Sequence, residues 1–71
     1  MNAEAALLKA NIDADVREIE SLYERLENYA DAPATELDPQ RIVIVITQAQ
    51  RLQKIYQSDF KEFKAFLDSL N

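Results

Sequence analysis

The sequence contains no cysteine, no histidine and no glycine, and each absence removes a class of site. Without cysteine the chain forms neither disulfides nor thiolate metal sites. Without histidine it lacks the commonest general base near neutral pH and the commonest metal ligand. Without glycine it has no glycine-rich loop of the kind that cradles phosphate groups. We therefore expect no catalytic residue, no cofactor-binding residue and no metal ligand, and hence no enzyme.

Long hydrophobic runs and an excess of positive charge are also missing. No apolar run reaches the roughly 18 to 20 residues that cross a bilayer, and the first residues do not show the basic and apolar segments of a signal peptide. We expect a cytoplasmic protein that does not contact membranes. The net charge of −5 disfavours binding to nucleic acid.

The charge is unevenly divided along the chain. Residues 1–38 hold ten acids and three bases, whereas residues 39–71 hold three acids and five bases. This asymmetry favours packing of the two halves against each other. It also predicts an acidic outer face that suits a basic partner protein.

What the chain does contain is a run of five β-branched residues, 42–46, which alone would suggest a buried strand. Asp38 and Pro39 just before the run are a good N-cap and first-turn pair for a helix. Residues 47–57 continue without a breaker and are rich in strong helix formers. We predict a helix, with burial offsetting the lower helix propensity of the β-branched residues.

One turn of that helix is apolar on every side. The residues of its main apolar stripe recur at steps of three and four: Ile42, Val45, Ile46, Ala49, Leu52 and Tyr56. Val43 and Ile44 lie off the stripe, Ile44 about 200° around the helix from Ile42. A subunit interface would cover them, so a Val43→Glu/Ile44→Glu variant should become monomeric or unfold. The alternatives are a third helix of the same chain or two tolerated exposed side chains.

The remaining segments complete a helical hairpin. Residues 3–30 carry a broad stripe at heptad positions a, d and e, which is typical of a helix in a bundle. Residues 31–38 form the connection, since Pro33 and Pro39 bracket it. Residues 39–70 continue one heptad frame and predict a single long helix, although a break near residues 57–59 would give a third helix.

Two helices alone cannot enclose a core. We predict an all-α chain, one domain over residues 1–71, in which two hairpins dimerise into a four-helix bundle; the alternative is a three-helix bundle. The predicted interface consists of Ile42, Val43, Ile44, Ile46, Phe60 and Phe63.

Two groups of acidic residues stand out within this frame. Asp15 and Asp59 occupy core-type d positions; we expect Asp15 near Lys54 and Ile55, and Asp59 near Lys9 and Asn11. The two alternatives are a charged group that fixes the register and a carboxylate at the rim that pairs with a lysine. The second group is a row on the first helix: Glu20, Glu24, Glu27 and Asp31. Dimetal carboxylate bundles need Glu-x-x-His, so we interpret this row as a solvated face. The alternative is a calcium or magnesium site with oxygen ligands only, for which the sequence has no dedicated loop.

Residues 8–27, Leu-Lys-Ala-Asn-Ile-Asp-Ala-Asp-Val-Arg-Glu-Ile-Glu-Ser-Leu-Tyr-Glu-Arg-Leu-Glu, resemble the opening helix of HepT-like proteins of the HEPN class. The resemblance lies in the spacing Asp…Ile…Leu-Tyr-x-x-Leu and in the second long helix after a short loop. It implies dimerising helical bundles that act in toxin–antitoxin pairs, where the toxin cleaves RNA. The catalytic signature of that family, an arginine followed closely by histidine, has no counterpart here, so no catalytic residue carries over.

Two hypotheses for function follow. The first is a non-enzymatic, self-associating protein–protein interaction module. The alternative, which depends on the resemblance, is a non-catalytic relative of a HEPN-type toxin–antitoxin component that binds a partner protein.

Overall fold

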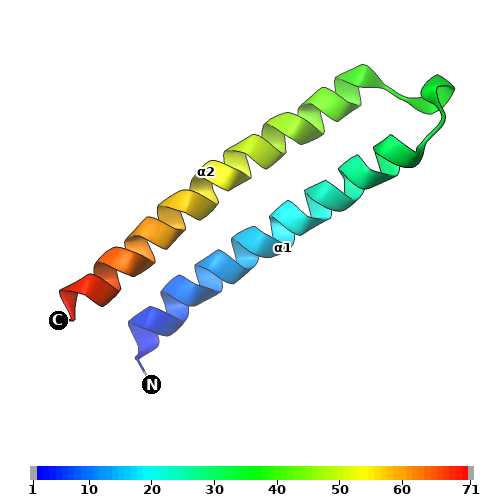
Figure 1. Cartoon of the computed structure of the whole chain (residues 1–71). Coiled ribbons are helices and arrows are strands. Elements are labelled where there is room, and N and C mark those ends of the chain that lie inside the picture. The colour runs from blue at the N-terminus through cyan, green and yellow to red at the C-terminus, as the bar shows by residue number, and fades with distance from the viewer. Residues whose placement is uncertain (1, 71) are drawn as a thin grey trace.

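The chain forms a hairpin of two long antiparallel helices (Figure 1). The structure, a computed structural model, describes residues 2–70. Helix α1 spans Ala3–Asp31, a short 3₁₀ turn η1 spans Ala34–Glu36, and α2 spans Pro39–Ser69. The predicted all-helical hairpin is confirmed. Helix α2 runs unbroken through residues 57–59, so the described residues form two long helices and not a three-helix bundle.

Side-chain caps define where both long helices begin. The Asp38 carboxylate accepts hydrogen bonds from the backbone amides of Gln40, at 3.1 Å, and Arg41, at 3.5 Å. Pro39, the first residue of α2, has no amide hydrogen that would need a partner. The predicted start of this helix is therefore confirmed. At the other helix, the Asn2 side chain accepts from the Ala5 amide at 3.1 Å.

The cap at Asp38 gives a simple stability prediction. Asp38→Ala is expected to lower the free energy of unfolding by about 1 kcal/mol, because first-turn amides lose their acceptor. The matched control is Asp31→Ala at the C-terminal end of α1, where a carboxylate opposes the helix dipole, so its removal should be neutral or slightly stabilising. Urea unfolding followed by circular dichroism, at one protein concentration, measures both. Equal stabilities of the two variants would contradict the capping role.

The β-branched run is helical, but one chain buries little of it. Val45 is 5% exposed, whereas Val43 and Ile44 are 59% and 57% exposed. The Thr47 hydroxyl donates to the Val43 carbonyl at 2.8 Å, so the polar side chain that follows the run is satisfied within the helix. A single chain therefore supplies only part of the burial that was expected to offset the low helix propensity of these residues.

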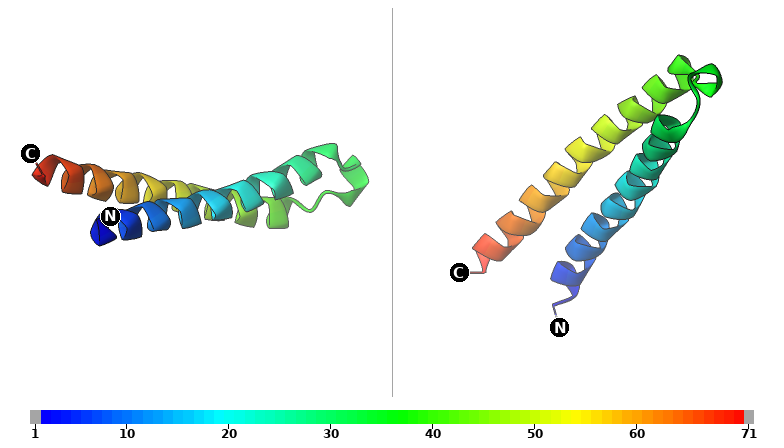
Figure 2. Two further views of the ribbon diagram at one scale, coloured as in Figure 1. Left: turned by 90° about the horizontal axis from the view of Figure 1, so that it is seen from below. Right: turned by 45° about the vertical axis from the view of Figure 1, so that its right-hand side comes forward.

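The hairpin is a thin, elongated layer. Its radius of gyration is 16.5 Å, whereas a compact domain of this length has about 11 Å. Its principal extents are 56 × 19 × 12 Å, and Figure 2 shows the two helices crossing at a shallow angle. Among the described residues no large side chain is fully buried. A layer one helix thick has two open faces.

Candidate interaction surfaces

The helices meet along a narrow apolar seam that separates the two open faces. Its central cluster joins three buried residues to three half-buried neighbours: Leu22, Val45, Ala49, Leu26, Tyr29 and Leu52. Leu8 and Ile12 extend the buried seam along α1 toward the N-terminus. The seam fixes the two helices relative to each other and thereby places the side chains on either side of it.

One open face, which we call the apolar face, consists of Tyr23 from α1 and Ile46, Phe60 and Leu67 from α2. These four side chains are 47%, 40%, 45% and 45% exposed. The three α2 residues differ by multiples of seven, so they form one row along the helix, and Gln53 fills the remaining step. The Gln53 side-chain amide donates to the Tyr23 hydroxyl at 2.6 Å. A neutral bridge between the helices thus lies within the row of large apolar groups.

Aromatic contacts and low charge continue along this face. The rings of Tyr56 and Phe60 lie edge to face with centroids 4.7 Å apart. The hollow around the Tyr23–Gln53 bridge is lined by one charged residue, Glu20. The apolar face therefore offers hydrophobic contact area with little charge near its centre.

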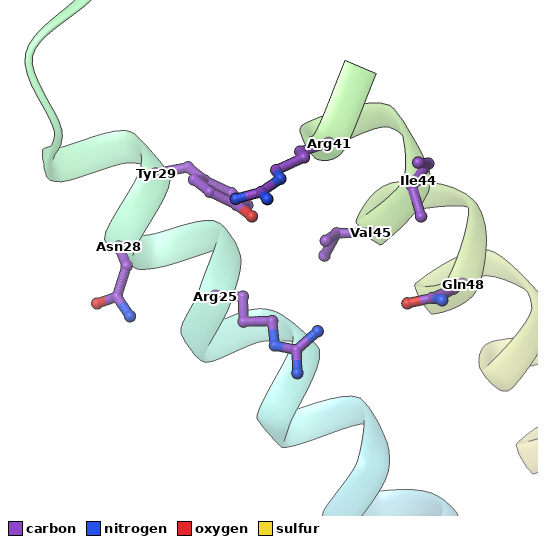
Figure 3. A pocket seen from close by; sticks show the side chains of 7 residues that line it. All are labelled: Arg25, Asn28, Tyr29, Arg41, Ile44, Val45 and Gln48. Carbon is purple, nitrogen blue, oxygen red and sulfur yellow. The ribbon is translucent and has the colours of Figure 1, made fainter. Parts of the chain in front are cut away.

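The other open face carries what we call the arginine groove. Ile44 lies nine residues from Gln53, about 180° around α2 at about 100° per residue, so the two faces are opposite. The groove consists of two hollows of about 450 and 470 Å³ that share Arg25 and Gln48. Figure 3 shows Arg25 from α1 and Arg41 from α2 reaching into the space between the helices. Arg51 and Ile55 line the second hollow.

The structure divides the predicted interface residues between different surfaces. Ile46 and Phe60 lie on the apolar face, whereas Ile44 lines the arginine groove. Val43 is two residues from buried Val45, about 200° around the helix, so it points away from α1. The last two members of the set, Ile42 and Phe63, are half-buried. The six residues therefore do not all lie on one face of the hairpin.

Asp15 and Asp59 lie beside each other between the two helices. One carboxylate oxygen of Asp15, Oδ2, is buried without a hydrogen-bond donor. A side-chain hydrogen bond to Asp59, burial, and the negative charges of Asp59 and Glu18 raise the pKa of Asp15 from 3.8 to about 6. Two ionised carboxylates have no hydrogen between them, so the bond forms when one of them carries a proton.

This pairing corrects the predicted surroundings of both residues. Asp15 lies beside Asp59, about one helical turn along α2 from the Lys54 region where it was expected. Lys9, the expected neighbour of Asp59, instead forms an ion pair with Asp13 on its own helix at 2.6 Å. The lysine pair at the rim does not describe two acids that face each other, whereas a role of these carboxyl groups in fixing the register stays a prediction.

The acidic row on α1 faces solvent. All four residues of the row are exposed: Glu20, Glu24, Glu27 and Asp31. Within residues 2–70, no three acidic side chains gather closely enough to hold a metal ion. Over the same range, neither helix contains a stretch apolar and long enough to span a bilayer. A basic partner for this row stays a prediction.

Sequence reasoning missed the Tyr23–Gln53 bridge, the Asp15–Asp59 pair and the arginine groove. Heptad positions already placed Tyr23 at an edge of the α1 stripe and both aspartates on facing stripes. Ile44, Gln48, Arg51 and Ile55 recur at steps of four, three and four, a signal that would have shown the groove side of α2.

Comparison of the chain with protein-family models, with curated proteins and with solved structures finds no match. The relationship to HepT-like proteins therefore stays a prediction from residues 8–27.

Proposed function

We propose that this protein is a non-enzymatic interaction module that works as a homodimer, with two hairpins joined through their apolar faces into a four-helix bundle. The observation that carries the proposal is the exposure of large apolar side chains on a layer one helix thick. Large apolar side chains that are exposed on one face in this way are typical of interfaces. Association would add the burial that a chain of 71 residues lacks alone.

The apolar face suits a two-fold contact better than the arginine groove does. In a symmetric dimer the same patch of both subunits meets, so groups near the axis face their own copies. On the apolar face those groups include the neutral Tyr23–Gln53 bridge. In the groove they would include Arg25 and Arg51, whose like charges repel.

Charge also favours one orientation of the two hairpins. Helix α1 has eight acids and three bases, a net charge of −5, whereas α2 has three acids and five bases, a net charge of +2. With both η1 turns at the same end of the bundle, α1 of one subunit lies on α2 of the other. With the turns at opposite ends, α1 would lie on a second α1. We therefore assign the first arrangement to the dimer.

Two measurements test this proposal: the mass of the protein in solution and the distance between one spin label on each subunit. The wild type is expected to have twice the 8.2 kDa mass of the chain by light scattering, with helicity that falls on dilution. Because the sequence has no cysteine, a nitroxide on Thr35→Cys is unique in each subunit. Turns at the same end place the two labels within about 30 Å, a few helix diameters.

Two outcomes would contradict these expectations. A chain that stays helical and cooperatively folded as a monomer at all concentrations would overturn the proposed dimer. A label separation near the 56 Å length of the hairpin would keep the dimer but reject the proposed orientation.

A further inference from the structure

The arginine groove has the shape of a binding site for a third helix. Its two hollows, of about 450 and 470 Å³, join at Arg25 and Gln48 and follow the gap between α1 and α2. From Arg41 to Arg51 the groove extends about 15 Å at 1.5 Å per residue of α2. An amphipathic helix of about three turns covers that length, and a groove between two helices is a common binding site for such a segment.

The floor of the groove is apolar. Leu22 and Val45 are buried in it, and Ile44 and Ile55 stand along α2 with 57% and 48% of their surface exposed. These side chains offer contact to an apolar stripe on an incoming helix. Apolar contact alone would not distinguish one partner from another, so the charged residues around the groove decide its specificity.

The rim of the groove concentrates positive charge in an acidic protein. Three of the four arginines of the chain line it, namely Arg25, Arg41 and Arg51, with a single carboxylate, Glu18. In the part of the chain that the structure describes, the ion pairs are Lys9–Asp13 and Lys64–Asp68. The three guanidinium groups thus keep their donors free, although the chain has thirteen acidic residues.

We propose that the arginine groove binds an acidic amphipathic helix of a different protein. Its apolar stripe contacts Ile44 and Ile55, and its carboxylates pair with the three arginines, because the guanidinium fork matches a carboxylate. The inference rests on the proposed dimer only in that a dimer joined through the apolar face leaves this groove open. A second copy is disfavoured as the occupant, since a two-fold contact here would oppose arginine to arginine.

The probe is a synthetic helical peptide of about three turns, with leucines at steps of three and four and glutamates on both flanks. A matched peptide carries glutamine in place of every glutamate. Fluorescence anisotropy is expected to show about tenfold weaker binding of the glutamine peptide and a decline of the glutamate peptide's affinity with added salt. The variant Arg25→Gln/Arg41→Gln/Arg51→Gln should lose about the same factor, since three partly exposed pairs act together.

Control variants separate the groove from general charge effects. Arg17→Gln changes the fourth arginine, which does not line the groove, and should leave binding unchanged. Circular dichroism checks that each variant folds. If the triple variant does not fold, Arg41→Gln alone, near the start of α2, serves in its place, with a smaller but measurable loss.

The outcomes distinguish this proposal from the dimer. Equal affinity for the two peptides, or wild-type affinity in the folded arginine variant, would overturn the groove assignment. A peptide that splits the dimer would place it on the apolar face, and a solution mass altered by the arginine variant would make a second copy the occupant. If the wild type is monomeric and still binds the glutamate peptide more tightly, the proposed dimer is wrong and the assignment of the groove stands.

Discussion

Asp15→Asn is expected to stabilise the folded protein at pH 7.5 and to remove much of its pH dependence between about pH 4 and 6. In the wild type, Asp15 loses its proton beside Asp59 and Glu18, with one oxygen buried and without a donor. The asparagine amide is neutral and supplies the hydrogen that the Asp59 carboxylate accepts. The substitution therefore imitates the protonated form of Asp15 at every pH.

The direction in which wild-type stability changes with pH follows from the raised pKa of Asp15. The folded state holds a proton on Asp15 up to about pH 6, whereas the unfolded chain releases it near 3.8. Between these values the folded state binds more protons, so wild-type stability falls as pH rises and levels off above pH 6. The full shift would correspond to about 3 kcal/mol, and partial contact with solvent reduces the expected gain of Asp15→Asn at pH 7.5 to about 1–2 kcal/mol.

Urea unfolding at one protein concentration, from pH 4.5 to 7.5, measures this difference. Asp68→Asn is the matched control, since Asp68 is exposed and pairs with Lys64 on the same helix. It should shift stability by less than about 0.5 kcal/mol and keep the wild-type slope. A wild type that is more stable at pH 7.5 than at pH 5, or an Asp15→Asn variant with an unchanged slope, would show that the two carboxyl groups do not share a proton.

The register of the two helices explains why this pair was not predicted. A heptad frame specifies which stripe of each helix faces the other, and it placed Asp15 and Asp59 on facing stripes. A shift of one turn along the axis leaves the same stripes in contact, so apolar spacing alone does not determine the alignment. The connection decides it, and the 3₁₀ turn Ala34–Glu36 in that connection was not predicted.

The helices themselves were predictable because local signals agreed. Asp38 and Pro39 outweighed the strand preference of the five β-branched residues, and the two prolines marked the connection. The candidate surfaces were only partly predictable. Apolar character on all sides of residues 42–46 indicated that something must cover this turn. This apolar character did not show that Ile46 lies on one face of the hairpin and Ile44 on the other, because the position of α1 determines which face each residue occupies.

The variant Ile46→Glu/Phe60→Glu should convert the dimer to monomers. Both side chains lie on the proposed interface at 40% and 45% exposure in the single hairpin, and a dimer contains each of them twice. Burying a large apolar side chain contributes about 1.5–3 kcal/mol, and a carboxylate in its place must leave water. The dissociation constant is therefore expected to rise at least about a hundredfold. Sedimentation equilibrium over a range of concentrations measures it.

The matched control places two glutamates on α2 outside the apolar face. Val43→Glu/Ile44→Glu replaces side chains that are more exposed, 59% and 57%, and that point away from α1 or into the arginine groove. The sequence alone predicted that this variant would become monomeric or unfold, whereas the apolar-face dimer requires it to stay folded and keep the wild-type mass. If Val43→Glu/Ile44→Glu dissociates while Ile46→Glu/Phe60→Glu remains dimeric, the subunits meet on the groove side. In that arrangement arginine would face arginine, and the groove would not be open to the peptide.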